Sequence, residues 1–322
     1  MTRTHLITGV TGQDGILLAR HLSGLDGRVV GTIRPGSPRA RARAAVYLPG
    51  VDVVEHDIRD TDGFRTILER HAPAQVYNLA AISSVGASWE RPEEAEEING
   101  AAVAGMLDVL DDHPAIRFLQ AGSAEQDGPA ASPYSSAKSA AQQHVTAARE
   151  RGLFACVALL HIHESPVRHP GFVVRKITRA AAAIRMGVQE ELTLGSLDVR
   201  RDWGAAVDTV RAFPAMLALD APADLQVATG TIHSLHDVLD CAFAAAGLGD
   251  PDRFVRQDRG LTRPADAALL QGDPTPLREA TGWEPRWTFE EMVAHMVRTD
   301  LQRLESGIAE SSSYLPAERG PR

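Results

Sequence analysis

Short apolar runs alternate with helix-like segments through the first half of this chain of 322 residues. Each run has the length of a buried strand, and the segments between them have helical length and spacing. The runs are THLITG, RVVGTI, VDVVEH, AQVYNLAA, IRFLQAG and FACVALLHI, and the helices are expected at about 15–24, 61–71, 92–112 and 133–151. Strands and helices that alternate in this way form right-handed βαβ units, so the sequence predicts a doubly wound α/β fold around a parallel sheet.

A glycine loop directly follows the first run, where LITGVTGQDGILLARHL places Gly9, Gly12 and Gly15 in the spacing GxxGxxG. Glycine permits positive φ, close approach of the backbone to a pyrophosphate, and tight packing of helix on strand. The start of the following helix supplies unpaired N–H groups and a positive dipole end. The sequence therefore predicts a dinucleotide site of the Rossmann type, with further contacts at Thr11, Gln13 and Asp14.

The end of the second predicted strand distinguishes NADP from NAD. An acidic residue there would bind the ribose 2′-hydroxyl, but this chain has Arg34 followed by more arginines in VVGTIRPGSPRARAR. Arginine pairs with a 2′-phosphate, so NADP is the predicted cofactor. After the third strand, Asp57 and the adjacent Ile58 are candidate adenine contacts. The carboxylate of Asp57 is also a typical N-cap for the next helix.

The segment SPYSSAKSA contains one of the two lysines in a chain that otherwise uses arginine. Tyr134 and Lys138 lie four residues apart on a predicted helix, so their side chains share one face. An ammonium group beside a phenol favours the phenolate, which makes Tyr134 a usable general base. Lysine suits this place because its compact amine can contact both a cofactor ribose and the phenol. The pair is predicted to be catalytic and to contact the cofactor.

Charge and composition narrow the expected partners. A formal net charge of −9 argues against nucleic acid or an anionic membrane as a main partner. The apolar runs fall short of the roughly 18 residues needed to span a bilayer, and MTRTHLITG has no signal-peptide pattern. Cys156 and Cys241 have neither metal-ligand nor redox spacing. A cytoplasmic enzyme with a small-molecule substrate and no metal is expected.

The alternation loosens after residue 163, which suggests a division of the chain. Residues 1–163 are expected to form the NADP-binding Rossmann domain, rejoined by a strand within about 200–232. Residues 164–304 are expected to form mainly a smaller, interleaved α/β lobe that binds the substrate. From 305 to 322 the sequence is polar and rich in Pro and Ser, which predicts a flexible tail.

With GxxGxxG and YxxxK in this order, the chain resembles the extended short-chain dehydrogenase/reductase superfamily. Further segments, up to about residue 300, resemble the GDP-mannose 4,6-dehydratase family. The most specific are HESPVR, RDWG and LQGD. The longer segments are VYNLAAISSVGASW, GLFACVALLHIHESP, VVRKITRAAAAI, LGSLDVRRDWG and LLQGDPTPLREATGWEP.

This resemblance implies oxidation of a sugar nucleotide at C4, elimination of water across C5 and C6, and return of the same hydride to C6. It implies that Glu125 removes the C5 proton, which the C4 ketone has acidified, and that Ser123 bonds O4 or assists the departing hydroxyl. Further implied cofactor contacts are Leu79, Ala80, Ala81, Ser83, His163 and Arg168, and implied contacts to a GDP-hexose are Ser84, Lys176, Arg201, Arg263 and Asp266.

Several positions depart from the family pattern. Ile162 replaces an Asn expected at the sugar-nucleotide phosphates, and Ile82 replaces a Gln. The usual Thr-Ser-Glu is Ser-Ala-Glu at 123–125, and Gln126-Asp127 replaces the usual Leu-Tyr or Met-Phe. We expect these changes to affect which sugar nucleotide binds, and to leave the hydride transfer intact.

Three other functions remain open at this stage. A GDP-4-keto-6-deoxymannose reductase has the same fold, cofactor and Tyr-Lys pair, but would consume NADPH stoichiometrically. A 4-epimerase would not need Glu125. A catalytically impaired NADP-binding or regulatory subunit would not need to retain Tyr134, Lys138 and Glu125.

The resemblance also implies an assembly. It predicts a homodimer built through the helices at about 92–112 and 133–151. A homotetramer would then form through the RPGSPRARAR loop at 34–43.

Overall fold

The computed structural model describes residues 3–25, 27–126, 132–258, 260, 269–317 and 319. The chain forms two compact units, and each is assembled from three segments. Unit 1 comprises Met1–Leu160, Val210–Val227 and Pro274–Trp283, and unit 2 comprises His161–Thr209, Ala228–Asp273 and Glu284–Arg322. The chain therefore returns twice to unit 1 after leaving it.

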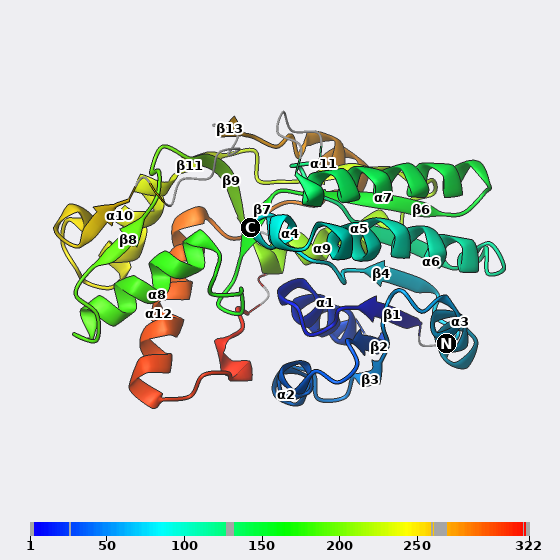
Figure 1. Ribbon diagram of the computed structural model, residues 1–322, viewed down its shortest axis with the longest axis horizontal. Helices are drawn as coiled ribbons and strands as arrows, with labels where there is room; N and C mark the ends of the chain where they lie inside the picture. Colours follow the sequence, from blue (N-terminus) through cyan, green and yellow to red (C-terminus); the bar gives the residue numbers. More distant parts are fainter. Residues whose placement is uncertain are drawn as a thin grey trace. The chain divides into compact units, whose positions relative to one another are not determined.

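Unit 1 is built on a seven-stranded sheet in the order β10-β6-β5-β4-β1-β2-β3, and all of its strand pairs are parallel (Figure 1). The strands are β1 (Thr4–Thr8), β2 (Arg28–Ile33), β3 (Asp52–Glu55), β4 (Gln75–Asn78), β5 (Arg117–Ala121), β6 (Ala155–Leu160) and β10 (Leu225–Val227). The strand order reverses between β1 and β4, as in doubly wound folds that bind nucleotides at this point. The predicted fold class is confirmed.

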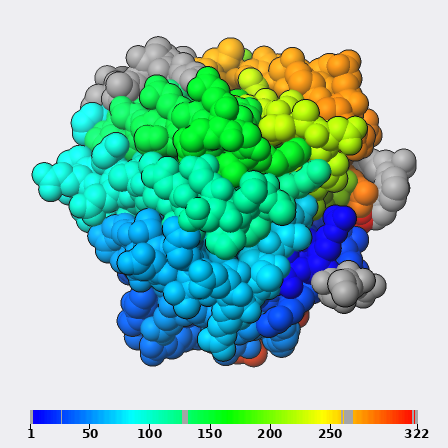
Figure 2. Space-filling view, turned by 90° about the vertical axis from the view of Figure 1, so that its right-hand side faces the viewer, coloured from blue at the N-terminus to red at the C-terminus, as the bar shows by residue number. Residues whose placement is uncertain are grey.

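Helices connect these strands. They are α1 (Gln13–Gly24), α2 (Pro38–Tyr47), α3 (Thr61–His71), α4 (Val85–Glu90), α5 (Pro92–Glu96), the π-helical turn η1 (Glu97–Ala101), α6 (Ala102–Leu110), α7 (Pro133–Glu150) and α11 (Thr275–Thr281). The helix α9 (Ala206–Met216) begins in unit 2 and continues into unit 1. Apolar residues from α3, α6 and α7 form one core with the sheet, which includes Phe64, Val103 and Val145. Figure 2 shows α5 to α6 and α7 as neighbouring bands on the surface of unit 1, cyan to teal and green.

The helix expected at 92–112 is interrupted. The π-helical turn η1 carries Asn99, which is 1% exposed. Its amide accepts a hydrogen bond from the Ile82 N–H at 2.9 Å and donates one to the Ile82 carbonyl at 3.0 Å. Such turns accommodate an extra residue in a helix, and here the buried amide holds the loop after β4.

The arginine-rich segment expected to be a loop is partly helical, because α2 begins at Pro38. Ser37 caps it by accepting a hydrogen bond from the Ala40 N–H, and proline occupies the first helical position. Serine before proline is a common helix start, so the sequence contained a signal for this helix.

Unit 2 contains two small sheets. One joins β11 (Ile232–Ser234), β9 (Arg200–Ala205) and β13 (Leu269–Leu270), and β7 (Ile162–Glu164) also pairs with β9. The other pairs β8 (Leu192–Leu194) with β12 (Val255–Gln257). The helices are α8 (Val173–Arg185), α10 (Leu235–Ala245) and α12 (Phe289–Ser306), with short turns η2 (Pro251–Arg253) and η4 (Ser312–Tyr314). Among the described residues of both units, no helix is both long enough and apolar enough to cross a membrane.

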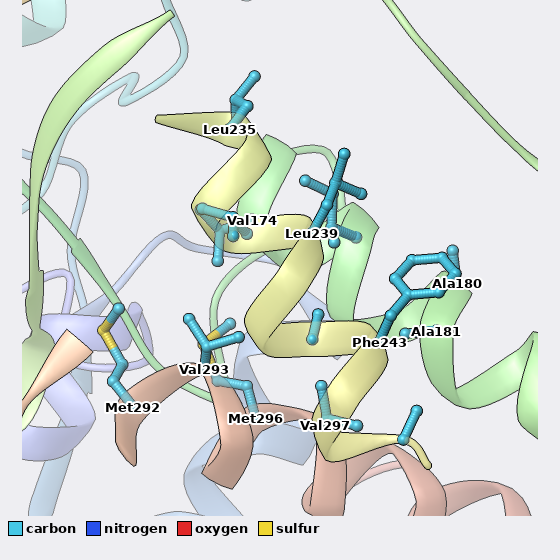
Figure 3. Close-up of a cluster of buried hydrophobic side chains, with 14 of the residues drawn as sticks. Val174, Ala180, Ala181, Leu235, Leu239, Phe243, Met292, Val293, Met296 and Val297 are labelled. Atoms are coloured by element: carbon cyan, nitrogen blue, oxygen red, sulfur yellow. The ribbon is translucent and has the colours of Figure 1, made fainter. Parts of the chain in front are cut away.

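The core of unit 2 lies where α8, α10 and α12 meet. Figure 3 shows Leu239 and Phe243 of α10, Ala181 of α8, and Met296 and Val297 of α12 gathered in this cluster. Each helix contributes apolar residues at intervals of three or four, so one face of each is buried.

The segment expected to be a flexible tail is packed in its described part. Tyr314 is 2% exposed, and its hydroxyl donates to the Ile308 carbonyl at 2.8 Å. The Arg303 guanidinium lies 4.6 Å from the centre of the Tyr314 ring, and that of Arg319 lies 3.8 Å from the Trp287 ring. One buried aromatic side chain and the stacked arginines supply contacts that the polar composition of the segment did not predict.

A buried ion cluster joins α8 to α12. Asp300, which is 3% exposed, pairs with Arg175 and, at 2.9 Å, with Arg303. Burial lowers the pKa of Arg175, and the adjacent Asp300 carboxylate opposes this effect. Arg175 begins the RKIT sequence of the segment VVRKITRAAAAI, and it therefore has a structural partner within unit 2.

We predict that Asp300→Ala lowers the free energy of unfolding by about 3–5 kcal/mol, because two arginines lose a buried carboxylate. Urea denaturation of the variant measures this loss. Asp240→Ala, at an exposed position of α10, is the control and should change stability by less than about 0.5 kcal/mol. Equal stability of the Asp300 variant and the wild type would contradict a cohesive role for the cluster.

Candidate active site

The glycine loop lies between β1 and α1, as the sequence predicted. Gly9 has φ of +66°, and a Cβ atom on it would lie 2.9 Å from the Ala80 Cα. A Cβ on Gly15 would lie 2.6 Å from the Gly9 carbonyl oxygen. Gly12 is the N-cap of α1 and has no side chain. The N–H groups of the first helical turn therefore receive no hydrogen bond acceptor from a side chain at the N-cap. These features fit a dinucleotide pyrophosphate.

The residues expected at the adenosine end follow β2 and β3. Arg34 is exposed directly after β2, and Arg43 of α2 donates through Nε to the Thr11 carbonyl at 3.0 Å. The Asp57 carboxylate pairs with Arg59 at 2.6 Å, and this bond lowers the pKa of Asp57 to about 2. Asp60, not Asp57, caps α3, so the N-cap alternative for Asp57 is wrong.

Polar side chains form a buried chain across the carboxyl ends of β1, β4 and β5. The Thr8 hydroxyl donates to Asn78 Oδ1 at 2.6 Å, and Asn78 Nδ2 donates to Gln120 Oε1 at 2.7 Å. Gln120 Nε2 donates to the Ala121 carbonyl at 3.0 Å. These residues were missed in the sequence, although each is a polar residue at or next to the end of an apolar strand.

The loop after β4 is bound to this chain. The Leu79 and Ala80 N–H groups both donate to the Thr8 hydroxyl at 3.1 Å. Further along, Ser83 is exposed and Ser84 caps α4 by accepting a hydrogen bond from the Ala87 N–H at 3.3 Å. Of the expected nicotinamide-side residues, Ala80 thus lies next to the glycine loop, since it abuts Gly9.

Tyr134 and Lys138 lie in the first turns of α7, which begins with a capping box at Ser132. Lys138 is 3% exposed, and its amine donates to the Ala121 carbonyl at 2.7 Å. The same nitrogen lies 5.9 Å from the centre of the Tyr134 ring. The two side chains are therefore neighbours at the carboxyl end of β5.

Burial lowers the pKa of Lys138 from 10.5 to about 8, while the Asp14 carboxylate in α1 acts in the opposite direction. The negative charge of Asp14 therefore stabilises the protonated form of the Lys138 amine. The lysine remains mostly protonated at neutral pH.

Ser123 and Glu125 lie in a tight turn after β5. The Ser123 hydroxyl accepts a hydrogen bond from the Glu125 N–H at 3.2 Å, and Ser123 is 6% exposed. The Ala124 N–H donates to the Leu160 carbonyl at 3.0 Å, which extends the pairing of β5 with β6. The Ser123 N–H donates to the side chain of Gln126 at 3.0 Å, a contact that sequence reasoning missed.

Four expected site residues of unit 2 have partners within that unit. His163 Nδ1 lies 2.7 Å from the His161 carbonyl, so this nitrogen carries the proton. The Arg168 guanidinium lies 3.6 Å from the Phe172 ring centre. The Lys176 amine donates to the Thr193 carbonyl at 2.6 Å, and Arg201 donates to the Arg200 carbonyl at 2.8 Å.

Two expected substrate contacts, Arg263 and Asp266, lie outside the described residues. Ile162, where the family pattern has Asn, pairs with Trp203 in β9 and packs against the core of unit 2. In the part of the chain that the structure describes, no group of three or more His, Cys, Asp or Glu side chains is arranged to hold a metal ion.

Comparison with known proteins identifies close relatives. The family model described as GDP-mannose 4,6 dehydratase matches residues 6–296. The chain is 36% identical to GDP-mannose 4,6 dehydratase 2 of Arabidopsis thaliana, over 98% of this chain and 92% of the relative. It is 32% identical to the human GDP-mannose 4,6 dehydratase, over 94% and 92% respectively. Among solved structures, RMD from Pseudomonas aeruginosa complexed with NADPH has a TM-score of 0.78 at 21% identity, and the match covers 94% of this chain and 99% of that chain.

The buried amine of Lys138 leads to a prediction about stability and pH. Its pKa is lower in the folded protein than in the unfolded chain, so the unfolded chain binds more protons between pH 8 and pH 10.5. Stability from this residue therefore rises with pH across that window. Between pH 8 and pH 10.5, the free energy of unfolding of the wild type should therefore rise by about 3 kcal/mol more than that of Lys138→Met.

Denaturation of both proteins at several pH values measures this difference. The control is Lys176→Met, because Lys176 is the second lysine of the chain and is exposed. Parallel profiles for the wild type and Lys138→Met would show that the amine is not buried as described.

Proposed function

Because the chain belongs to the GDP-mannose 4,6-dehydratase family, we propose that it converts GDP-mannose to GDP-4-keto-6-deoxymannose. It is a lyase, with NADP as its catalytic cofactor. The observation that carries this proposal for the chain's own residues is the buried Lys138 amine beside the Tyr134 ring. Both residues lie in the unit that carries the glycine loop and the turn with Ser123 and Glu125.

The NADP site is proposed along the carboxyl edge of the sheet in unit 1. NADP supplies an acceptor for the hydride from C4 and a donor for its return at C6. The glycine loop would hold the pyrophosphate, because Gly9 and Gly15 leave no space for a side chain there. Arg34 would pair with the 2′-phosphate, and the loop from Leu79 to Ser83 would border the nicotinamide.

Tyr134 is proposed as the base of the first step, taking the proton of the C4 hydroxyl as C4 is oxidised. The positive charge of Lys138 stabilises the phenolate. Because its amine is bonded to the Ala121 carbonyl, the lysine is held in place beside the ring. Removal of the proton and of the hydride leaves a ketone at C4.

Glu125 is proposed to act in the elimination. The C4 ketone acidifies the C5 proton, so a carboxylate can remove it. The electron pair left at C5 expels the C6 hydroxyl, which would take up the proton that Glu125 removed and leave as water. Return of the hydride to C6 and uptake of a solvent proton at C5 would complete the product. Ser123, which is held in the same turn, would bond O4 or the departing hydroxyl.

Contacts to the sugar nucleotide are proposed at Ser84 and Lys176, together with Arg201, Arg263 and Asp266. His163 and Arg168 are proposed as further cofactor contacts. Support for these roles comes from the match of their motifs to the family pattern.

We also propose a cytoplasmic location and a homodimer or homotetramer, with no nucleic-acid or membrane partner. Cys156 and Cys241 are both free thiols, which suits a reducing compartment. The proposed dimer surface includes α5, α6 and α7. Light scattering coupled to size-exclusion chromatography measures the assembly directly.

The activity is tested by incubating the purified protein with GDP-mannose and NADP in deuterated water. Proton NMR should show a 4-keto-6-deoxy product with deuterium at C5. Net absorbance of the reduced cofactor should stay constant, whereas a reductase would consume NADPH stoichiometrically. Other NDP-hexoses, tested in parallel, address the substitution at Ile162. Absence of product from every hexose would overturn the proposal.

For Glu125→Gln we expect product formation to fall by about 100-fold or more, because the amide cannot accept the C5 proton. Oxidation at C4 should persist, so the reduced cofactor accumulates transiently. Stopped-flow absorbance and NMR exchange at C5 measure the two steps. Equal loss of both signals would contradict the role of Glu125.

For Lys138→Arg we expect a folded protein with strongly reduced turnover. The guanidinium is wider than the amine and cannot keep both the bond to the Ala121 carbonyl and its place beside Tyr134. Turnover should fall by about 100-fold, with a circular dichroism spectrum like that of the wild type. Near-normal turnover would contradict the need for a compact amine.

A further inference from the structure

We propose that Gln126 is a positioning residue for the elimination step, because it holds the turn that carries Ser123 and Glu125. This inference rests on the proposed function and deepens it. Gln126 is 7% exposed and occupies a position where the family pattern has an apolar residue. Its contacts show how an amide performs a task that an apolar side chain cannot.

Gln126 is bonded to Ser123 twice. Its side-chain oxygen accepts the Ser123 N–H at 3.0 Å, and its own N–H donates to the Ser123 carbonyl at 3.2 Å. Glu125 lies between these two residues, and its N–H donates to the Ser123 hydroxyl. The backbone that carries the proposed base is therefore closed into a turn by Gln126.

A chain of side chains connects this turn to the rest of unit 1. Gln126 Nε2 donates to Gln142 Oε1 on α7, and Gln142 Nε2 donates to Asp224 at 3.2 Å. Asp224 also accepts from Arg149 at 2.6 Å and from the Val157 N–H of β6 at 2.8 Å. The turn is thus tied to α7 and, through Asp224, to the segment that precedes β10.

Two features show why an amide is required at this position. One side chain must accept from the Ser123 N–H and donate to Gln142 at the same time, which a carboxylate or an apolar group cannot do. The space is also confined, since a Cβ on Gly122 would lie 3.2 Å from Gln126 Oε1. Loss of the amide would leave the buried Ser123 N–H and the Gln142 oxygen without these partners.

The oxidation pair is held by other bonds. The Tyr134 N–H donates to the Ser88 hydroxyl at 3.2 Å, and the Lys138 amine donates to the Ala121 carbonyl. A change at Gln126 should therefore displace Glu125 more than Tyr134. A displacement of about 1 Å at a reacting group can cost roughly 100-fold in rate.

The test is Gln126→Met, which has a similar length and removes both side-chain bonds. Product formation from GDP-mannose should fall by about 100-fold, while the initial rate of C4 oxidation should fall by less than about threefold. The reduced cofactor should accumulate as in Glu125→Gln. Gln142→Met should give the same imbalance, and the double variant should be no worse than Gln126→Met, because both act through one chain.

Gln143→Met is the matched control, since this neighbouring glutamine on α7 is exposed. It should leave both steps unchanged. Hydrogen exchange in the free protein gives a readout independent of catalysis. The Ser123 amide should exchange at least about tenfold faster in Gln126→Met, while amides of the β4 core keep their protection.

The outcomes separate this inference from the proposed function. An active wild type with proportional loss of both steps in Gln126→Met, or with unchanged exchange at Ser123, would overturn the positioning role and leave the function standing. A wild type that forms no product would overturn the proposed function and, with it, this role.

Discussion

The site depends on one buried hydrogen bond, from the Lys138 amine to the Ala121 carbonyl. Removing an amine from water is costly, and burial correspondingly lowers its pKa to about 8. A carbonyl at the end of a strand offsets part of this cost, because it cannot move away from the amine. The bond also orients the first turns of α7, which carry Tyr134. A single contact therefore links the fold of the sheet to the placement of the phenol that we propose as the catalytic base.

The same carbonyl ends a polar chain that begins at the glycine loop. Thr8, Asn78 and Gln120 bond in series across three adjacent strands, and Gln120 donates to Ala121. Buried polar groups of this kind are stable when their donors and acceptors are matched. Because the Thr8 hydroxyl also accepts hydrogen bonds from two backbone N–H groups of the loop after β4, the proposed cofactor region and the proposed catalytic region share one network.

Sequence reasoning predicted the parts of this arrangement that have a local pattern. Alternating runs predicted the sheet, and the spacings of Gly9 to Gly15 and of Tyr134 to Lys138 predicted two pieces of the site. Contacts between distant residues left no such pattern. Asn99 reaches Ile82, and Tyr314 is buried in a segment of polar composition. These pairings depend on tertiary packing, which spacing along one segment does not encode.

Motif residues in unit 2 show that a motif shared with the family also has a role within the fold. Asp202 of RDWG accepts hydrogen bonds from the Thr229 and Gly230 N–H groups at 3.0 and 2.7 Å, so it shapes a turn next to β11. Arg175 of RKIT belongs to a buried ion pair. The likeness of these motifs to the family is thus explained in part by the fold itself. The adjacent Arg201 and Lys176 are therefore better judged by binding measurements than by their motifs.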